Sequence, residues 1–297
     1  MATQHAFCIN PCFSQLWNVN AILTAKIKSR YQACCTTNLT LKTVMSGSAR
    51  YATPRSIHTV EPGSYLVLNQ HQFYELDILK STNTETLAIF FEPRFVEQAI
   101  AARSTDAMRL LDDPDESPGQ TAPFVEALQT FQGGIARSIR RIARQLKADP
   151  TGESWLEDEF YAIGASLPSA HQQAREQWQR IPSVRNSTQK ELYRRLAHAR
   201  DYAYSCFQEE LTVQRLASIA KLSPFHFHRG FRQAFGVTPN HFLRERRLQV
   251  ACKLLKETDM PVTHICLAVG FSSLGSFSAL FRNHFGVSPS SWRTQQD

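Results

Sequence analysis

Cationic and hydroxyl side chains occur twice, at a constant spacing, in the last third of this 297-residue sequence. Arg232 and Arg282 are 50 residues apart, and Ser223 and Ser273 show the same separation. Guanidinium and hydroxyl groups bind phosphate oxygens and base edges, so this chemistry is non-covalent recognition of a polyanion. The catalytic patterns G-x-S-x-G, G-x-G-x-x-G, H-E-x-x-H and the phosphate-binding loop are absent from the sequence. We therefore expect a protein that is not an enzyme.

The repeated residues belong to a longer pattern that is written twice, at 211–242 and at 261–292. Phe-Gly-Val-Thr-Pro at 235–239 and Phe-Gly-Val-Ser-Pro at 285–289 are 50 positions apart, whereas the residues upstream are offset by 49. The second copy has therefore gained one residue in its turn. A repeat of this length marks one structural unit used twice, and each copy predicts a helix, a tight turn and a second helix.

Apolar spacing and capping residues define the helices of each copy. A stripe at i, i+3, i+4 and i+7 predicts a short first helix, and phenylalanines at every fourth residue predict the buried edge of a second helix. Ser223 and Gly236 are expected to cap that second helix in the first copy. Pro239 is expected to open a long helix that ends near Lys256, about 27 Å away at 1.5 Å per residue. The apolar positions are Val213, Leu216, Ala217, Ala220, Phe227, Phe231 and Phe235 in the first copy, and Val262, Ile265, Cys266, Val269, Phe277, Phe281 and Phe285 in the second.

A short buried helix followed by a helix with a basic outer face is typical of a helix-turn-helix, whose second helix enters the major groove of DNA. The stretches SPFHFHRGFRQAFGVTP (223–239) and GFSSLGSFSALFRNHFGVSPSSWR (270–293) resemble the doubled DNA-binding domain of the AraC/XylS family of transcription regulators. The resemblance implies a DNA-binding domain in which one chain reads double-stranded DNA with two motifs. It places base-reading residues at Phe225, His228, Arg229, Leu274, Gly275, Ser278 and Ala279, and phosphate contacts at Ser223, Arg232, Ser273 and Arg282.

The outward face of the second motif departs from the polar and basic residues that many family members use. Leu274 and Ala279 carry no hydrogen-bond donor, so they can contact only an apolar group such as a thymine methyl. We therefore expect the first motif to supply most of the base-specific hydrogen bonds. The second motif is expected to act more through phosphates and DNA shape.

The charge distribution supports a polyanion-binding C-terminal part. Residues 185–297 contain 16 basic and 8 acidic residues, whereas 1–184 contain 17 and 18. This excess is typical of a domain that neutralises phosphates, although a solvated surface gives the same count. No apolar run reaches the length of a membrane span, and the start of the sequence does not have the pattern of a signal peptide. With seven cysteines in no regular framework, we expect a reduced, cytoplasmic protein. No cofactor is expected, and no metal, because the barrel segment expected at about 39–92 has only His58 and His71 and no H-x-H pair.

The domain organisation follows from shifts in composition. We expect a sensing and dimerisation domain at 1–168, with a barrel at about 39–92 and helices at about 94–167. A linker is expected at 169–190, because this stretch is polar and has few apolar residues. The DNA-binding domain is expected at 191–297. The fold class is therefore α+β and multidomain, ending in an all-α domain of two helix-turn-helix motifs joined by a long helix.

The segments EPGSYLVLN (61–69) and FFEP (90–93) resemble the cupin-like ligand-sensing barrel that precedes the DNA-binding unit in many AraC-family regulators. A barrel mouth suits a small organic effector, and aromatic residues are candidates for its lining. A place in the core explains each of them equally well. The resemblance further implies homodimer contacts through the helices, and RNA polymerase as a partner if the protein is an activator. The candidate lining residues are Tyr51, Tyr65, Phe73 and Tyr74.

Two further patterns keep alternative functions open. Cys8 and Cys12, with Cys34 and Cys35, are similar to the zinc-bound cysteine region of DNA-repair methyl acceptors that carry the same DNA-binding unit. Adjacent cysteines chelate one metal poorly, so free thiols are the favoured interpretation. A stripe of arginines at helical spacing could bind nucleic acid, but salt bridges and solvation are favoured. The stripe comprises Arg137, Arg140, Arg141 and Arg144.

A partner-protein adaptor with a degenerate DNA unit is a third hypothesis.

Overall fold

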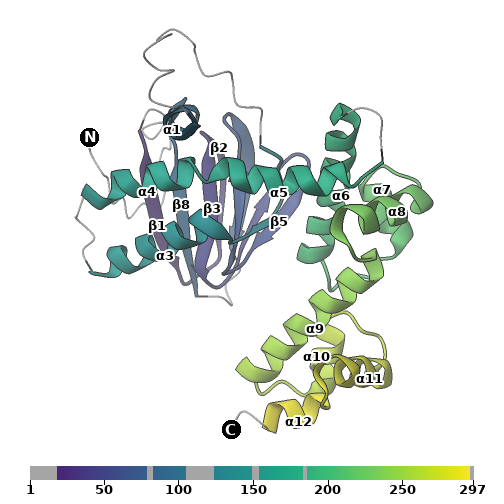
Figure 1. The fold of residues 1–297 in the computed structure, drawn as a ribbon. Coiled ribbons are helices and arrows are strands. Elements are labelled where there is room, and N and C mark those ends of the chain that lie inside the picture. Colours follow the sequence, from purple (N-terminus) through teal and green to yellow (C-terminus); the bar gives the residue numbers. More distant parts are fainter. Residues whose placement is uncertain (1–18, 79–82, 105–123, 149–153, 183–185, 295–297) are drawn as a thin grey trace. The chain divides into compact units, whose positions relative to one another are not determined.

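A computed structural model describes residues 19–78, 83–104, 124–148, 154–182 and 186–294. The chain divides into two compact units, Met1–Trp178 and Gln179–Asp297. The first combines two β-sheets with helices, and the second is built from helices, as the fold class predicts at this level (Figure 1). No helix within the described ranges is both long and apolar enough to cross a membrane.

The strands of the first unit form two antiparallel sheets. Within the part of the chain that the structure describes, one sheet has five strands in the order β1-β8-β3-β6-β9, and the other has four in the order β2-β7-β4-β5. No strand pairing joins the two sheets among the described residues, so the expected closed cupin-like barrel is not observed. Short strands separated by turns predict a barrel and a sandwich equally, because both fold types produce the same pattern. The strands are β1 Ala21–Ile27, β2 Tyr31–Thr37, β3 Thr40–Ser46, β4 Ala49–Ala52, β5 Ile57–Val60, β6 Ser64–Leu68, β7 Gln72–Ile78, β8 Thr84–Phe90 and β9 Gln129–Thr130.

The sheets extend beyond the predicted limits of 39–92. Strand β1 pairs with β8 along its whole length, from Ala21 opposite Phe90 to Ile27 opposite Thr84. Strand β2 pairs with β7 in the second sheet. Strand β9 lies outside the predicted limits as well, and pairs with β6. These strands are edge strands whose partners are distant in sequence, and pairing of this kind is invisible to local patterning.

Side chains of the five-stranded sheet divide between two cores. Tyr65 and Val67 of β6 lie in a cluster with residues of the helices. Leu66 and Leu68 lie in a second cluster with residues of the four-stranded sheet. This follows from the alternation of side chains along a strand. The five-stranded sheet is thus covered by the second sheet on one face and by helices on the other.

The helices of the first unit differ from the prediction at two places. Helices were expected at about 94–167, but this range also contains strand β9, which pairs with β6, and α3 begins only at Gly133. Residues expected to form a linker instead form most of α5, in which Ala174 and Trp178 are buried. This stretch is polar in composition, but its few apolar residues lie on one edge of α5 and are buried in the first unit. The helices are α1 Phe95–Ser104, α3 Gly133–Ala148, α4 Ser154–Gly164 and α5 Leu167–Gln179.

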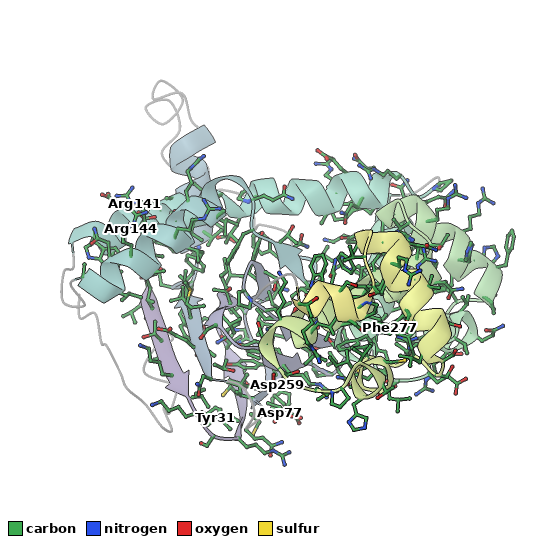
Figure 2. The ribbon with its side chains drawn as sticks, turned by 90° about the horizontal axis from the view of Figure 1, so that it is seen from below. Tyr31, Asp77, Arg141, Arg144, Asp259 and Phe277 are labelled. Atoms are coloured by element: carbon green, nitrogen blue, oxygen red, sulfur yellow. The ribbon has the colours of Figure 1, made fainter. Side chains whose placement is uncertain are left out.

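The basic stripe of the first unit lies on the exposed face of α3. Arg141 donates from Nε to Oε1 of Glu159 on α4 at 2.9 Å, while Glu159 itself is buried. Arg137, Arg140 and Arg144 are exposed, and Arg141 and Arg144 are labelled in Figure 2. The favoured interpretation, a solvated face with a salt bridge, agrees with this arrangement.

The second unit contains the predicted doubled motif. Helix α9 runs from Pro239 to Glu257, one residue beyond the predicted end, and joins the two copies (Figure 1). A further helix, α6, precedes the first copy and begins at Asn186. The helices are α6 Asn186–Ser205, α7 Val213–Ile219, α8 Pro224–Phe235, α9 Pro239–Glu257, α10 Val262–Ala268, α11 Leu274–Phe285 and α12 Pro289–Thr294.

Candidate nucleic-acid interface

The first motif is defined at each helix end by a backbone cap. The side chain of Thr212 accepts the backbone N–H of Arg215 and starts α7. Ser223 accepts the N–H of His226 at 3.4 Å and starts α8, with Pro224 at the first helical position. Gly236 ends α8 in the left-handed region at φ 79°. The predicted caps are therefore confirmed, and they fix where the second helix of the motif begins and ends.

Phenylalanines hold the inner face of α8. Phe227 and Phe231 are buried, with their ring centres 5.5 Å apart. Phe231 also meets Phe235 at 4.8 Å and Phe242 of α9 at 5.8 Å. Burial of this edge leaves the opposite face of α8 to the solvent. That face carries Phe225, His228, Arg229 and Arg232, all of which are exposed.

The second motif repeats this construction. Ser273 accepts the N–H of Ser276 and starts α11, and Gly286 ends it at φ 83°. Phe277, labelled in Figure 2, and Phe281 are buried, with ring centres 5.7 Å apart. The turn spans 220–223 in the first motif and 269–273 in the second, so the extra residue lies where the change of offset predicted it.

The outward face of α11 carries no charged group in its first turns. Leu274, Gly275 and Ala279 are exposed, while Ser278 is half-buried. Arg282 is exposed in the last turn of the helix. This face therefore offers methyl groups and backbone, with one partly covered hydroxyl, where the first motif offers an imidazole and a guanidinium. Ser223 and Ser273 are exposed too, but their oxygens already serve as N-caps.

Several arginines of the second unit hold the protein together instead of facing outward. Arg200 pairs with buried Asp201 at 2.6 Å. Burial alone would lower the pKa of Arg200, but its interactions with Asp201 and Tyr193 outweigh this and raise the pKa. Arg246 donates to the carbonyl oxygen of Tyr204 and lies 3.8 Å from the centre of its ring. Arg293 donates to the carbonyl oxygen of Met260 at 2.6 Å. The basic excess of this unit thus overstates the charge available to a polyanion.

Arg247 forms a junction between the two motifs, which sequence reasoning missed. From α9 it donates to the carbonyl oxygens of Phe207 and Glu209, both at 2.8 Å, in the loop before α7. Its guanidinium also lies 5.6 Å from the ring centre of Phe271, in the turn of the second motif. Arg247 therefore connects the loop before the first motif to the turn of the second.

Gly270 completes this junction. It has φ 87°, and a Cβ built there would lie 2.9 Å from the carbonyl oxygen of Gln208 and 3.0 Å from that of Phe207. Lys221 occupies the matching position of the first motif at φ 54°. Both motifs thus need the left-handed region here, but only the second also needs the absence of a side chain.

The four aromatic effector candidates are not brought together. Tyr51 and Tyr74 lie in the core between the sheets, with ring centres 5.8 Å apart, and the hydroxyl of Tyr74 accepts from Lys42 at 3.1 Å. Burial lowers the pKa of Lys42 to about 7. Tyr65 lies on the opposite face of the five-stranded sheet, and Phe73 is 43% exposed. Side chains along a strand point alternately to its two faces, and the sequence did not show which face of each strand points inward. This alternation separates the candidates.

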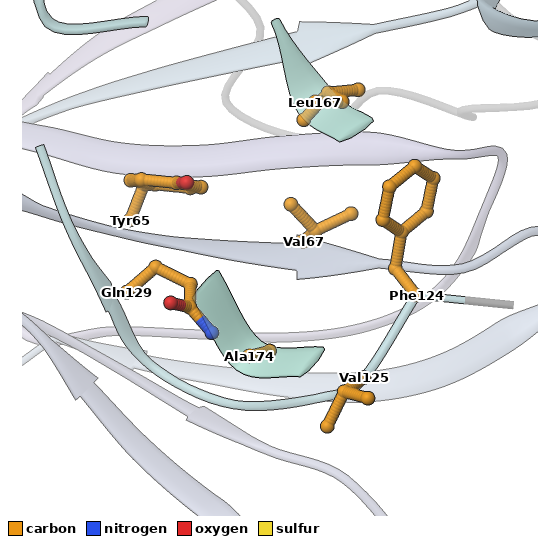
Figure 3. A pocket seen from close by; sticks show the side chains of 7 residues that line it. All are labelled: Tyr65, Val67, Phe124, Val125, Gln129, Leu167 and Ala174. Atoms are coloured by element: carbon orange, nitrogen blue, oxygen red, sulfur yellow. The ribbon is translucent and has the colours of Figure 1, made fainter. Parts of the chain in front are cut away.

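A small pocket lies against the helix-covered face of the five-stranded sheet (Figure 3). Its volume is about 20 Å³, enough for a water molecule and far below the several hundred Å³ that usually hold a drug-sized ligand. Tyr65 is the one effector candidate that lines it. The lining residues are Tyr65, Val67, Phe124, Val125, Gln129, Leu167 and Ala174.

The cysteines that raised the methyl-acceptor hypothesis are partly described. Cys34 and Cys35 lie on β2 as free thiols, and burial raises the pKa of Cys35. Cys8 and Cys12 lie outside the described residues. Within the described part of the chain, no cluster of three or more histidine, cysteine or acidic side chains has the geometry of a metal site.

Comparisons with known proteins cover the doubled motif. A family model described as a helix-turn-helix domain matches residues 216–295. The probable transcription factor PqrA of Proteus vulgaris is 35% identical over 85 residues, which are 29% of this chain and 70% of that protein. The bifunctional transcriptional activator/DNA repair enzyme AdaA of Bacillus subtilis is 32% identical over 93 residues, which are 31% of this chain and 44% of AdaA.

A solved transcriptional regulator from Chromobacterium violaceum, described as an AraC-type DNA-binding domain-containing protein, is 33% identical, with a TM-score of 0.33. That match covers 34% of this chain and 91% of the other. Other curated relatives are matched over a smaller part, and the chain spans only 38% of the length of LumQ of Photobacterium leiognathi. The doubled motif, the matching family model and the match to PqrA over 70% of its length agree. The chain belongs to the AraC family of transcription regulators.

Proposed function

We propose that this protein is a sequence-specific DNA-binding transcription regulator whose helices α8 and α11 enter the major groove. The observation that carries the proposal is the duplicated construction of these helices. Each is capped by a serine, held by buried phenylalanines and exposed on the opposite face. A helix fixed in this way presents its outer side chains to base edges, and the first turn is the part that reaches deepest in helix-turn-helix proteins.

The side chains of α8 suit base-specific hydrogen bonds. Arg229 is exposed and matches the O6 and N7 acceptors of guanine through two parallel N–H groups. His228 lies beside it on the outward face and can donate or accept. Arg232 and Arg282 lie nearer the ends of their helices, where phosphate contacts set register without reading sequence. The hydroxyls of Ser223 and Ser273 remain able to donate to phosphate while their oxygens cap the helices.

Selection of bound sites from a random pool of duplex DNA, with the full chain at near-physiological salt, tests the proposal. One enriched asymmetric site about two helical turns long is expected for a monomer with two motifs. Two such sites in fixed relation would add a homodimer. Retention of DNA without an enriched sequence would mean that charge alone holds the DNA, and would contradict the proposal.

Replacing Arg229 by alanine is expected to weaken binding to the selected site by about 1–3 kcal/mol and to relax the preference at one base pair. Replacing Arg282 by alanine is expected to weaken all sequences similarly and to reduce the slope of log affinity against log salt by about 1. Titration of the selected site and its single-base variants at several salt concentrations measures both effects.

The control for this pair is Arg137→Ala on α3, which removes one exposed cation from the other unit and should leave the base preference unchanged. An equal loss on every sequence for Arg229→Ala would show that Arg229 contacts phosphate and does not read a base.

The first unit is proposed to control the second. Many members of this family carry a front domain that senses a small organic effector. The sequence resemblance at 61–69 and 90–93 motivates the same role here, with two sheets in place of a closed barrel. An effector changes DNA binding only if its affinity differs between two states of the protein. Contacts of the helices α3 to α5 with a second copy would provide dimerisation. Several relatives are named activators, and an activator would have RNA polymerase as a partner.

A DNA-repair methyl acceptor remains the alternative function, because AdaA is named a repair enzyme as well as an activator. The match to AdaA is confined to 93 residues and gives no support for the cysteine chemistry. Incubation with methylated DNA followed by mass analysis separates the two functions. Methylation of Cys8 or Cys12 together with stoichiometric zinc would favour the alternative.

A further inference from the structure

Large apolar side chains are exposed at few positions in the described residues. They are Phe73, Tyr161, Phe225, Leu267 and Leu274. Two of these five lie in the first turn of the two helices proposed to enter DNA. Phe225 is 70% exposed at the second position of α8, and Leu274 is 42% exposed at the first position of α11. Exposure of an apolar side chain to water is unfavourable, and a binding partner that covers the side chain removes this cost.

The packing around both residues excludes a role in the core. The buried edge of α8 consists of Phe227, Gly230, Phe231 and Ala234, and that of α11 of Phe277 and Phe281. Phe225 makes its ring contact with the exposed neighbour His226, at 5.7 Å between centres. In α11, a Cβ added to Gly275 beside Leu274 would meet nothing closer than 3.8 Å. Both side chains therefore stand on open surface that faces the proposed ligand.

In the major groove the apolar group available to such side chains is the methyl on C5 of thymine, because the other base-edge atoms are hydrogen-bond donors and acceptors. We propose that Phe225 and Leu274 each read a thymine methyl, so that the bound DNA carries one such thymine in each half-site, about one helical turn apart. This inference rests on the proposed function and adds its chemistry of selection. The inference also gives the outward face of α11, which has few polar groups, a way to read a base without a hydrogen bond.

Deoxyuridine tests the inference, because it differs from thymidine only by the lost C5 methyl. In the selected site, each thymine is replaced in turn by deoxyuridine and the dissociation constant is measured for the full-length protein. Two positions, about one helical turn apart, are each expected to weaken binding about fourfold, the effect of exposing one methyl-sized group. The remaining thymines serve as internal controls and should have no effect.

Variants assign each methyl to its side chain. Phe225→Ala should abolish the effect of deoxyuridine at one position and leave the other intact, and Leu274→Ala should do the reverse. Leu274→Met keeps an apolar end and should retain the effect. Leu267→Ala removes a side chain that is 64% exposed on α10, outside the two recognition helices, and should leave both effects unchanged. Because all these side chains are exposed, the variants should fold as the parent does.

The outcomes separate this inference from the function beneath it. A selected site that is insensitive to deoxyuridine at every thymine overturns the inference and leaves sequence-specific binding standing. So does a sensitivity that survives both alanine substitutions. Failure to select any site overturns the proposed function and the inference with it.

Discussion

Replacing Phe231 by alanine is expected to lower the free energy of unfolding of the second unit by about 3–5 kcal/mol, the usual effect of truncating a buried phenylalanine. Phe231 has no exposed surface and contacts the rings of Phe227, Phe235 and Phe242. The last of these belongs to α9, so the cavity would loosen α8 both internally and against the helix that joins the motifs. Specific DNA binding is expected to fall with stability, because packing of this inner edge holds the outer face of α8 in place.

Hydrogen exchange of the backbone amides of α8 is the suitable measurement, since a chain with two units does not give one unfolding transition. The matched control is Phe225→Ala, which removes the same side chain from the exposed face of the same helix. Its effect on exchange should stay within about 0.5 kcal/mol, as for most surface substitutions. Similar exchange rates for the two variants would contradict the proposed packing role of Phe231.

Replacing Gly270 by alanine is the second change expected to have a large effect. A side chain in the left-handed region costs about 1–2 kcal/mol. Collision of the new Cβ with the carbonyl oxygens of Phe207 and Gln208 adds about 1–3 kcal/mol, as overpacking does elsewhere. The strain falls on the junction made by Arg247, so we expect the turn of the second motif to separate from the loop before the first.

Gly286→Ala provides the comparison for this effect. Gly286 has φ 83°, and a Cβ there meets nothing within 4 Å, so only the conformational cost should appear. Hydrogen exchange of α10 and α11 in the two variants measures the difference, which is expected to be about 1–3 kcal/mol. Equal destabilisation would show that the contacts around Gly270 contribute nothing beyond its backbone conformation.

The doubled motif could be predicted from sequence because each of its determinants is local. Serine caps, glycine ends and phenylalanines at every fourth residue act within one helix, and the structure contains them where they were expected. Pro239 opened α9 as predicted. The outward residues of both recognition helices followed from the same periodicity, since burial of one helix edge determines which side chains are exposed.

Features that depend on distant partners could not be predicted. Strand β1 lies before the expected start of the barrel because its place in the sheet depends on pairing with distant β8. Most of α5 was taken for a linker because its buried Trp178 stands in a polar sequence. Arg247 was counted with the DNA-facing charge, although its guanidinium binds two carbonyl oxygens of the protein. Tyr65 of the five-stranded sheet faces the helices, whereas Tyr74 of the four-stranded sheet faces the core between the sheets. The face that each strand presents depends on pairing with distant strands, which the sequence does not show.

The junction at Arg247 has a consequence for the geometry of the operator. A rigid connection between two reading helices fixes their angular phase around the duplex as well as their separation. One base pair inserted between the half-sites moves the second by about 3.4 Å and turns it by about 34°. If α9 and the junction do not yield, only one helix can then engage, and the protein should discriminate operators by their helical phase, with tolerance returning when Arg247 is replaced by glutamine.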